Sequence, residues 1–156
     1  MMKNSGFTLF ELITAVAIIT ILSSFTIIKL IGWLPKYKLG SAVRTMHCTF
    51  QFARVAAVNK NSTVSVVFSP GSDSWFAFLD NGDGGGTPDD GLQNGTEKLV
   101  KKIDLPAGID LKNPTFGSML QFNNRGMPNA GGDVSVEIKA LSRTVRILLS
   151  GKSSIL

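Results

Sequence analysis

A long apolar run near the N-terminus is the strongest pattern in the chain. Residues 12–28 carry no charge, and two threonines are the only polar residues between Leu12 and Leu22. Residues 7–34 would form roughly 42 Å of helix at about 1.5 Å per residue. A bilayer core requires about 20 apolar residues, so this segment is long enough to span it. A buried core helix is the less favoured interpretation of a run that is apolar on every face. We therefore predict a membrane-spanning helix over residues 7–34.

A cleaved secretory signal is a third interpretation of such a run. A signal of that kind has several positive charges, a short apolar region and a small-residue cleavage site. Here only Lys3 precedes the run, and no small-residue site clearly closes it. We expect the apolar helix to be retained in the mature protein.

The pattern changes after Pro35. Apolar residues then recur three or four positions apart, as one stripe of a helix does; they are Leu39, Val43, Met46, Phe50, Ala53 and Ala57. This spacing predicts an amphipathic helix over residues 35–60 whose stripe packs on a sheet. The opposite face is expected to look outward and carries Arg44, His47, Gln51 and Arg54. Because proline removes a helix hydrogen bond, we expect a kink or break near residues 32–35.

Short β-rich runs bounded by Gly, Pro, Asn and Asp fill the rest of the chain. The predicted strands are Thr63–Phe68, Trp75–Leu79, Leu99–Ile103, Ile109–Lys112, Met119–Asn123, Val134–Ile138 and Thr144–Ile147. The last two alternate apolar and polar residues, as half-buried strands do. A long helix followed by these strands indicates an α+β fold, in which the helix packs on an antiparallel β-sheet domain.

Composition and charge narrow the function classes. The 156 residues carry 16 Lys and Arg against 11 Asp and Glu, and residues 35–60 are basic without any acid. The lone cysteine, Cys48, and the lone histidine, His47, leave too few ligands for a structural zinc site. The two residues point about 100° apart on a helix, so they do not form a nucleophile–base pair. We therefore predict no catalytic residues, which disfavours a membrane-tethered enzyme.

Glu11 lies one turn inside the apolar run. A carboxylate costs on the order of 3 kcal/mol in hydrocarbon, so it needs a partner or a local function. Thr8 and Glu11 fit the Ser/Thr-x-x-Glu capping box, in which the carboxylate accepts from a free N–H at the helix start. The alternative is an ion pair, for which only a freed α-amino group could supply the cation.

The residues around Glu11 belong to a wider motif. The segment Ser5-Gly6-Phe7-Thr8-Leu9-Phe10-Glu11-Leu12 joins a short basic leader to the apolar run, and it resembles the processing site of type IV prepilins and pseudopilins. The resemblance implies that a prepilin peptidase cleaves between Gly6 and Phe7 and N-methylates Phe7. It also implies that Glu11 pairs with the amino group of a neighbouring subunit's first residue during filament assembly, and a buried carboxylate is tolerated once it is paired.

The later chain resembles a narrower group, the H-type pseudopilins (GspH) and the FimT/FimU-like minor pilins. The similar elements are the Trp75–Leu79 strand, Leu105-Pro106-Ala107-Gly108, Phe122-Asn123-Asn124-Arg125-Gly126-Met127-Pro128, and Arg143-Thr144-Val145-Arg146 followed by Gly151-Lys152. Some FimT-like members bind DNA through a C-terminal Gly-Arg-x-Arg element, where this chain has Gly151-Lys152-Ser153-Ser154. Arg143, Arg146 and Lys152 are therefore a secondary prediction for DNA contact.

An acidic, glycine-rich loop follows the second predicted strand. Residues 80–91 read Asp-Asn-Gly-Asp-Gly-Gly-Gly-Thr-Pro-Asp-Asp-Gly. Calcium takes six to eight oxygen ligands, and Asp80 and Asp83 are the candidate ligands, although they are three residues apart and no bidentate Glu closes the loop. The favoured interpretation is a solvated hairpin loop in which Gly and Asp form local turns.

Together these features predict a non-enzymatic structural subunit in four parts. The parts are a leader over residues 1–6, a transmembrane and filament-core helix over 7–34, an amphipathic helix half over 35–60 and a β-rich domain over 61–156. We predict a GspH-like minor pseudopilin of a type II secretion pseudopilus, with a FimT/FimU-like minor pilin of a type IV pilus as the alternative. The expected partners are prepilin peptidase, major and other minor pseudopilins or pilins, and the inner-membrane assembly platform. The expected location is the inner membrane, with a cytoplasmic N-terminus and a periplasmic domain, and afterwards the filament.

Overall fold

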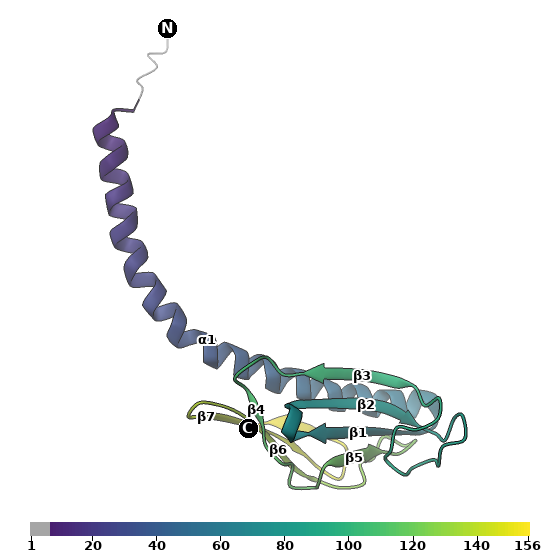
Figure 1. Cartoon of the computed structure of the whole chain (residues 1–156). Coiled ribbons are helices and arrows are strands. Elements are labelled where there is room, and N and C mark those ends of the chain that lie inside the picture. Colours follow the sequence, from purple (N-terminus) through teal and green to yellow (C-terminus); the bar gives the residue numbers. More distant parts are fainter. Residues whose placement is uncertain (1–6) are drawn as a thin grey trace. The chain divides into compact units, whose positions relative to one another are not determined.

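The computed structural model describes residues 7–156, apart from the side chains of residues 25–31. The chain forms two compact units, residues 1–36 and 37–156. Helix α1 (Leu9–Lys60) belongs to both, and the strands all lie in the second unit (Figure 1). The strands are β1 (Thr63–Ser69), β2 (Ser74–Asp80), β3 (Leu99–Asp104), β4 (Asp110–Leu111), β5 (Met119–Phe122), β6 (Gly132–Ile138), β7 (Leu141–Ile147) and β8 (Ser153–Ile155). The predicted α+β class is confirmed.

In the first unit, helix α1 carries its apolar side chains on its surface. All side chains from Phe7 to Ser24 are exposed, ten large hydrophobic residues among them. Among the residues that the structure describes, no helix combines the length and apolarity needed to cross a bilayer. The predicted 7–34 span includes residues 25–31, whose side chains lie outside the described part of the chain.

Helix α1 continues through Pro35 without interruption. A proline inside a helix removes one backbone hydrogen bond and costs about 3 kcal/mol, and the helical backbone on both sides of Pro35 tolerates that loss. The predicted helix break near residues 32–35 is therefore wrong. The predicted kink, which concerns how the two units are placed, stays a prediction.

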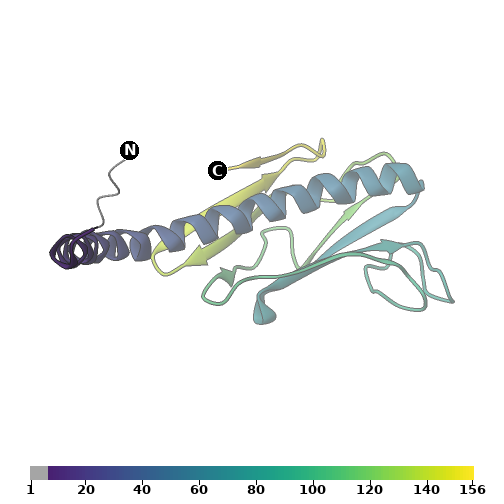
Figure 2. The same cartoon turned by 90° about the horizontal axis from the view of Figure 1, so that it is seen from above.

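In the second unit, α1 buries the predicted stripe. Each member of the stripe is less than a tenth exposed; the six are Leu39, Val43, Met46, Phe50, Ala53 and Ala57. Figures 1 and 2 both show this part of the helix alongside the strands. The spacing of three and four therefore identifies the face that packs into the core, as predicted.

The strands form two antiparallel four-stranded sheets rather than one. The first sheet has the order β3-β2-β1-β5, and the second has the order β4-β6-β7-β8. The seven predicted strands are all present with small shifts at their ends, and β8 is an eighth that the sequence analysis missed. β8 has only three residues, Ser153–Ile155, and pairs with the end of β7, so it is too short to produce a visible alternation.

Alternation along the first sheet directs one set of side chains to the helix. Val64, Val66 and Phe68 of β1 are buried, and Phe68 pairs with Trp75 across the β1–β2 ladder. The ring of Phe68 also packs edge-on against Phe50 of α1, with 6.0 Å between ring centroids. Trp75 Nε1 donates a hydrogen bond to Thr49 Oγ1 at 3.3 Å, which satisfies the indole N–H inside the core.

The polar face of the helix is not wholly outward. Gln51 Nε2 donates to Ser153 Oγ at 2.8 Å, and His47 Nε2 lies 3.2 Å from the Ser153 carbonyl oxygen. Arg54 Nη1 reaches the Gly151 carbonyl oxygen at 3.4 Å. The prediction of an outward polar face is therefore wrong for these three residues, because the C-terminal segment packs there; Arg44 is exposed as predicted.

Candidate functional site

Thr8 and Glu11 form the predicted capping box at the start of helix α1. The Thr8 backbone N–H donates to Glu11 Oε2 at 3.1 Å, and the Glu11 N–H donates to Thr8 Oγ1 at 3.3 Å. The Thr8 hydroxyl donates to the same carboxylate oxygen at 3.1 Å. The local interpretation of Glu11 is thus confirmed: the carboxylate satisfies a free N–H at the helix start.

Glu11 is nonetheless the only charged side chain between Phe7 and Ser24. The hydroxyls of Thr14, Thr20, Ser23 and Ser24 donate to helix carbonyls one turn earlier, at 2.7–2.9 Å. Among the described residues, no cationic side chain forms an ion pair with Glu11. The carboxylate of Glu11 therefore lies on an otherwise apolar, exposed surface, where a cation from outside the chain can reach it.

The predicted processing site lies partly outside the described residues. Gly6 belongs to the segment 1–6, about which the structure says nothing, whereas Phe7 is described and is 88% exposed. The cleavage between Gly6 and Phe7 and the methylation of Phe7 remain predictions.

Asp80 ends strand β2 with a buried carboxylate. Its Oδ2 accepts three hydrogen bonds: from Ser65 Oγ at 2.6 Å, from the Gly91 N–H at 2.8 Å and from Gln121 Nε2 at 3.2 Å. Its Oδ1 is buried and has no hydrogen-bond partner. Asp80 was a candidate because of its spacing in the loop, and nothing in that spacing indicated that the carboxylate would be buried.

Asp80 and Asp83 do not line the same pocket. Asp80 lines a polar pocket of about 360 Å³ together with Asp89, whereas Asp83 is exposed and lies outside this lining. The complete lining is Asn61, Ser62, Thr63, Asp80, Asn81, Pro88, Asp89, Asn123 and Asn124. Within residues 7–156, no group of three or more His, Cys, Asp or Glu gathers to hold a metal ion. A cation in this pocket would thus depend on two carboxylates and on neutral oxygens.

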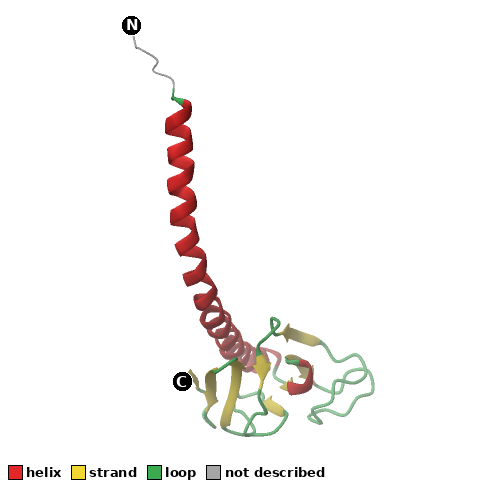
Figure 3. Cartoon of the chain, turned by 60° about the vertical axis from the view of Figure 1, so that its left-hand side comes forward, coloured by secondary structure: helices red, strands yellow, loops and turns green. Residues whose placement is uncertain are grey.

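Glu97 is a second buried carboxylate of the same loop, and the sequence analysis missed it. Its Oε1 accepts from the Gly82 N–H at 2.9 Å, and its Oε2 accepts from the Asn94 N–H at 3.0 Å. Glu97 thus helps to close the long connection between β2 and β3, together with the Thr96 N–H, which donates to the Asp83 carbonyl oxygen at 2.9 Å. The connection is the long loop beside the strands in Figure 3 and lies between the strands labelled β2 and β3 in Figure 1. The only feature of the sequence that could have indicated Glu97 is a single Glu among Gly, Asn and Thr. Without the fold, such a Glu cannot be distinguished from a solvent-exposed one.

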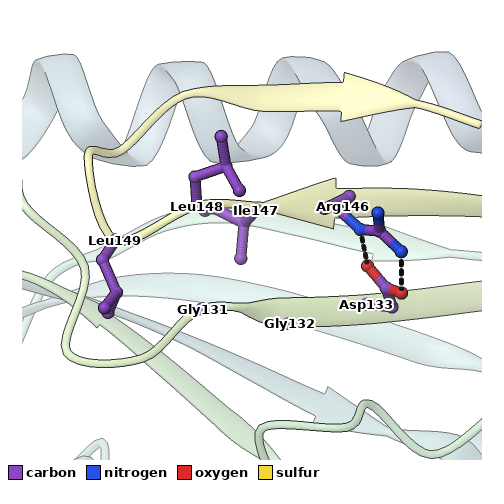
Figure 4. A pocket seen from close by; sticks show the side chains of 7 residues that line it. All are labelled: Gly131, Gly132, Asp133, Arg146, Ile147, Leu148 and Leu149. Atoms are coloured by element: carbon purple, nitrogen blue, oxygen red, sulfur yellow. Dashed lines mark hydrogen bonds and ion pairs between the residues drawn. The ribbon is translucent and has the colours of Figure 1, made fainter.

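The three basic residues predicted for DNA contact do not form one surface. Arg143 and Arg146 are three residues apart on β7, so their side chains point to opposite faces of the sheet. Arg146 makes a bidentate pair with Asp133, both bonds at 2.8 Å (Figure 4). The hydrogen bonds of this pair lower the pKa of Asp133 and raise the pKa of Arg146. Lys152 is exposed and precedes β8.

An open apolar pocket adjoins the Asp133–Arg146 pair. Its walls include Gly131, Ile147, Leu148 and Leu149 (Figure 4), and Leu148 and Leu149 are exposed. Because Asp133 neutralises Arg146, this part of the sheet offers little net positive charge to an anionic ligand.

His47 and Cys48 have different surroundings in the structure. The His47 ring contacts the Ser153 carbonyl oxygen, and Cys48 is an exposed free thiol. The absence of catalytic residues stays a prediction.

Two family models match the chain. The one described as "Type II transport protein GspH" matches residues 42–151, and the one described as "Prokaryotic N-terminal methylation motif" matches residues 1–27. The first covers well over half of the chain, and the second includes the predicted leader, Phe7 and Glu11. No curated protein gives a significant sequence match.

Two solved structures share the fold. The type IV minor pilin FimU of Pseudomonas aeruginosa superposes with a TM-score of 0.58 at 16% identity, covering 76% of this chain and 92% of FimU. The minor pseudopilin EpsH from the Type 2 Secretion System of Vibrio cholerae superposes with a TM-score of 0.57 at 14% identity, covering 76% of this chain and 96% of EpsH. At such identities the likeness shows a shared pilin-like fold.

Proposed function

The chain belongs to the family of type II transport protein GspH, and from that premise we propose that it is a minor pseudopilin of a type II secretion pseudopilus. The observation that carries the proposal is the presence of two family matches on one chain. A methylation motif covers residues 1–27 and a GspH match covers residues 42–151. A leader followed by an apolar helix and a small β domain is the arrangement that filament subunits of this class need.

The proposal gives each part of the first unit a role. Prepilin peptidase cleaves between Gly6 and Phe7 and methylates the new N-terminus, and the helix anchors the subunit in the inner membrane before assembly. In the filament, the exposed apolar side chains between Phe7 and Ser24 pack against helices of other subunits. Their burial there removes apolar surface from lipid or water and leaves Glu11 in an apolar setting.

Glu11 is proposed to set the axial position of the subunit. A buried carboxylate is stable when a cation pairs with it, and the α-amino group of a neighbouring subunit's Phe7 is such a cation. The capping bonds from Thr8 involve Oε2, so the carboxylate has acceptor capacity left for this partner. The subunit itself performs no reaction in this proposal.

The likeness to FimU supports a second candidate function, a minor pilin of a type IV pilus. Both candidates need the same processing and the same helix packing, and they differ in the host machine. Deleting the gene and scoring protein secretion, surface pili and DNA uptake side by side separates them. A defect in secretion alone supports the pseudopilin, whereas loss of pili with intact secretion contradicts it.

DNA uptake through direct DNA contact remains a prediction of the minor-pilin alternative. DNA binding that depends on phosphate contacts weakens steeply with salt. Because Asp133 already pairs with Arg146, we expect Arg143→Ala and Lys152→Ala to weaken any binding more than Arg146→Ala does. Binding that does not change with salt, or no binding, contradicts this alternative.

A further inference from the structure

We propose that a pocket between helix α1 and the end of strand β3 binds the headgroup of an anionic phospholipid. The pocket has a volume of about 340 Å³, and all the residues that line it belong to the second unit. The proposal rests on the proposed membrane anchor, because it takes the ligand from the bilayer that α1 crosses.

Helix α1 contributes a polar wall with free hydrogen-bond donors. Lys38, Ser41 and Thr45 line the pocket and are three and four residues apart, so they lie on one face of the helix. Among the side chains that the structure describes, none forms an ion pair with Lys38, and none forms a hydrogen bond with the hydroxyl of Ser41 or Thr45. An ammonium group and hydroxyls are donors that suit the oxygens of a phosphate.

One carboxylate, that of Asp104, also lines the pocket. Lys102 Nζ lies 3.6 Å from Asp104 Oδ1, so a neighbouring cation already compensates this charge. The helix on the other side of the pocket carries no acidic residue between positions 35 and 60. Lys38 is therefore the cation of this pocket without a counter-charge in the described chain, and it favours an anionic ligand.

The wall opposite the helix is apolar and comes from the end of β3 and the turn after it. Ile103 and Leu105 are half-buried there, and Pro106 is exposed. A phospholipid carries its phosphate next to glycerol and acyl carbons, so it can contact Lys38 and this apolar wall together. A free phosphate ion would leave the apolar wall uncovered, which favours the lipid as the ligand.

The pocket begins close to the end of the predicted membrane span. That span ends at Leu34, and Lys38 follows four residues later on the same helix, which is about 6 Å at 1.5 Å per residue. The headgroup layer on each side of a bilayer core is about 5–8 Å thick. In the membrane-anchored subunit, Lys38 therefore lies at the depth of the lipid phosphates.

The lysines at this end of the span run against the usual charge distribution. Only Lys3 precedes the predicted span, whereas Lys36 and Lys38 follow it closely. Lys and Arg are normally enriched on the cytoplasmic side of a membrane, and the proposed orientation puts Lys36 and Lys38 on the periplasmic side. Attraction to an anionic headgroup gives a cation at this position a role.

Titration of the full-length protein in neutral detergent micelles with phosphatidylglycerol tests the proposal. With Trp33→Phe in all variants, the fluorescence of Trp75 reports unfolding of the second unit. We expect the unfolding midpoint to rise by about 5 °C at ten times the half-saturating lipid concentration. Lys38→Gln should raise that half-saturating concentration by about tenfold, because a hydrogen bond between two charged groups is lost.

Lys36→Gln is the matched control. It removes the same charge two residues away, from a side chain that points about 160° from Lys38 around the helix and does not line the pocket. We expect it to change the half-saturating concentration by less than about twofold, because a single lipid in a neutral micelle presents no extended anionic surface.

Two further ligands distinguish the anionic lipid from other sources of phosphate. Phosphatidylcholine has the same phosphate but no net charge, and glycerol 3-phosphate has the charge but no acyl chains. Both should raise the midpoint much less than phosphatidylglycerol does. The proposal is overturned if phosphatidylglycerol produces no shift, if either of these ligands acts equally, or if Lys36→Gln weakens binding as much as Lys38→Gln.

Alkaline extraction of cell membranes tests the anchor separately. A protein that stays in the membrane but does not bind phosphatidylglycerol overturns the lipid site and leaves the proposed function intact. A protein that is released from the membrane contradicts the anchor, and the proposed function then fails together with the lipid site.

Discussion

The two ends of helix α1 use apolar residues in opposite ways. Between Phe7 and Ser24 every side chain is exposed, and the apolar residues surround the helix. Between Leu39 and Ala57 they form one stripe, and that stripe is buried against the strands. The apolar side chains of the second part are buried within their own chain, whereas those of the first part are exposed.

This difference separates folding from assembly within a single helix. Burial of apolar surface contributes about 25 cal/mol per Å², and the second unit gains that contribution when it folds. The first unit gains this contribution only when lipid or other helices cover its apolar side chains. A filament subunit needs such a helix for its assembly with other subunits. Hydrophobicity alone does not distinguish the two parts, but the period of the apolar residues does.

Two phenylalanines on the same helix give the largest contrast. Phe50 is 1% exposed, and Phe10 is 76% exposed. Phe50→Ala should lower the free energy of unfolding of the second unit by about 3–5 kcal/mol, because it leaves a cavity in the core. Phe10→Ala should change it by less than about 0.5 kcal/mol.

Denaturant unfolding of the full chain in detergent measures both effects. Trp33→Phe in all variants leaves Trp75, which is buried in the core, as the fluorescent reporter. A loss for Phe10→Ala as large as that for Phe50→Ala would contradict the separation of folding from assembly.

Substitutions at Glu11 and Thr8 distinguish the helix-capping role of Glu11 from its proposed ion pair with a neighbouring subunit. Glu11→Gln keeps a residue that can close the capping box but removes the negative charge. We expect incorporation into filaments to fall by about tenfold or more, because the buried α-amino group of the neighbouring subunit's Phe7 loses its counter-charge. Thr8→Ala removes the capping hydroxyl and keeps the charge, and it should cost about 1 kcal/mol of helix stability with little effect on incorporation. Quantifying each variant in sheared filaments tests this, and equal losses would mean that Glu11 acts only as a cap.

The contacts between the helix and the C-terminal segment should have a smaller effect. Gln51→Leu removes the hydrogen bond to Ser153 Oγ and should lower the free energy of unfolding by about 1 kcal/mol. Thr14→Val in the first part removes only the hydroxyl that donates to the Phe10 and Glu11 carbonyl oxygens of the preceding turn, and it should leave the unfolding of the second unit unchanged. Equal effects would show that the two parts of the helix unfold together.

The smallest expected effect concerns Asp133 and Arg146. The hydrogen bond from Arg146 lowers the pKa of Asp133 in the folded protein, so the pair contributes stability above the unfolded pKa of about 3.9. That contribution is lost as pH falls through the lower folded pKa, and it is small because solvent screens exposed pairs. Asp133→Asn should lower the unfolding midpoint slightly at neutral pH and not at all in strong acid; a larger effect in acid would contradict this sign.

The sequence predicted what depends on local pattern. The stripe from Leu39 to Ala57, the seven strands and the Thr8–Glu11 cap each follow from the period or spacing of a few neighbouring residues, and the structure has them all. The predicted helix break near residues 32–35 is wrong, because a proline removes only one helix hydrogen bond and a long helix tolerates that loss.

What the sequence did not predict depends on contacts between distant segments. The burial of Asp80 requires Ser65, Gly91 and Gln121 to meet at one point, and the packing of β8 requires Gln51 to meet Ser153. Spacing in the loop therefore suggested Asp83 as the partner of Asp80, whereas the folded loop brings Asp89 to the pocket that Asp80 lines.

The mass of the N-terminal peptide of the membrane-extracted protein tests the central claim most directly. If the chain is a processed filament subunit, the peptide begins at Phe7 and is heavier by one methyl group, and the charge of Glu11 then has a free amine to meet. A peptide that still begins at Met1, from cells with an active prepilin peptidase, would contradict the account. Glu11 would then be a helix cap, and the second unit would be a β domain on an unprocessed apolar helix.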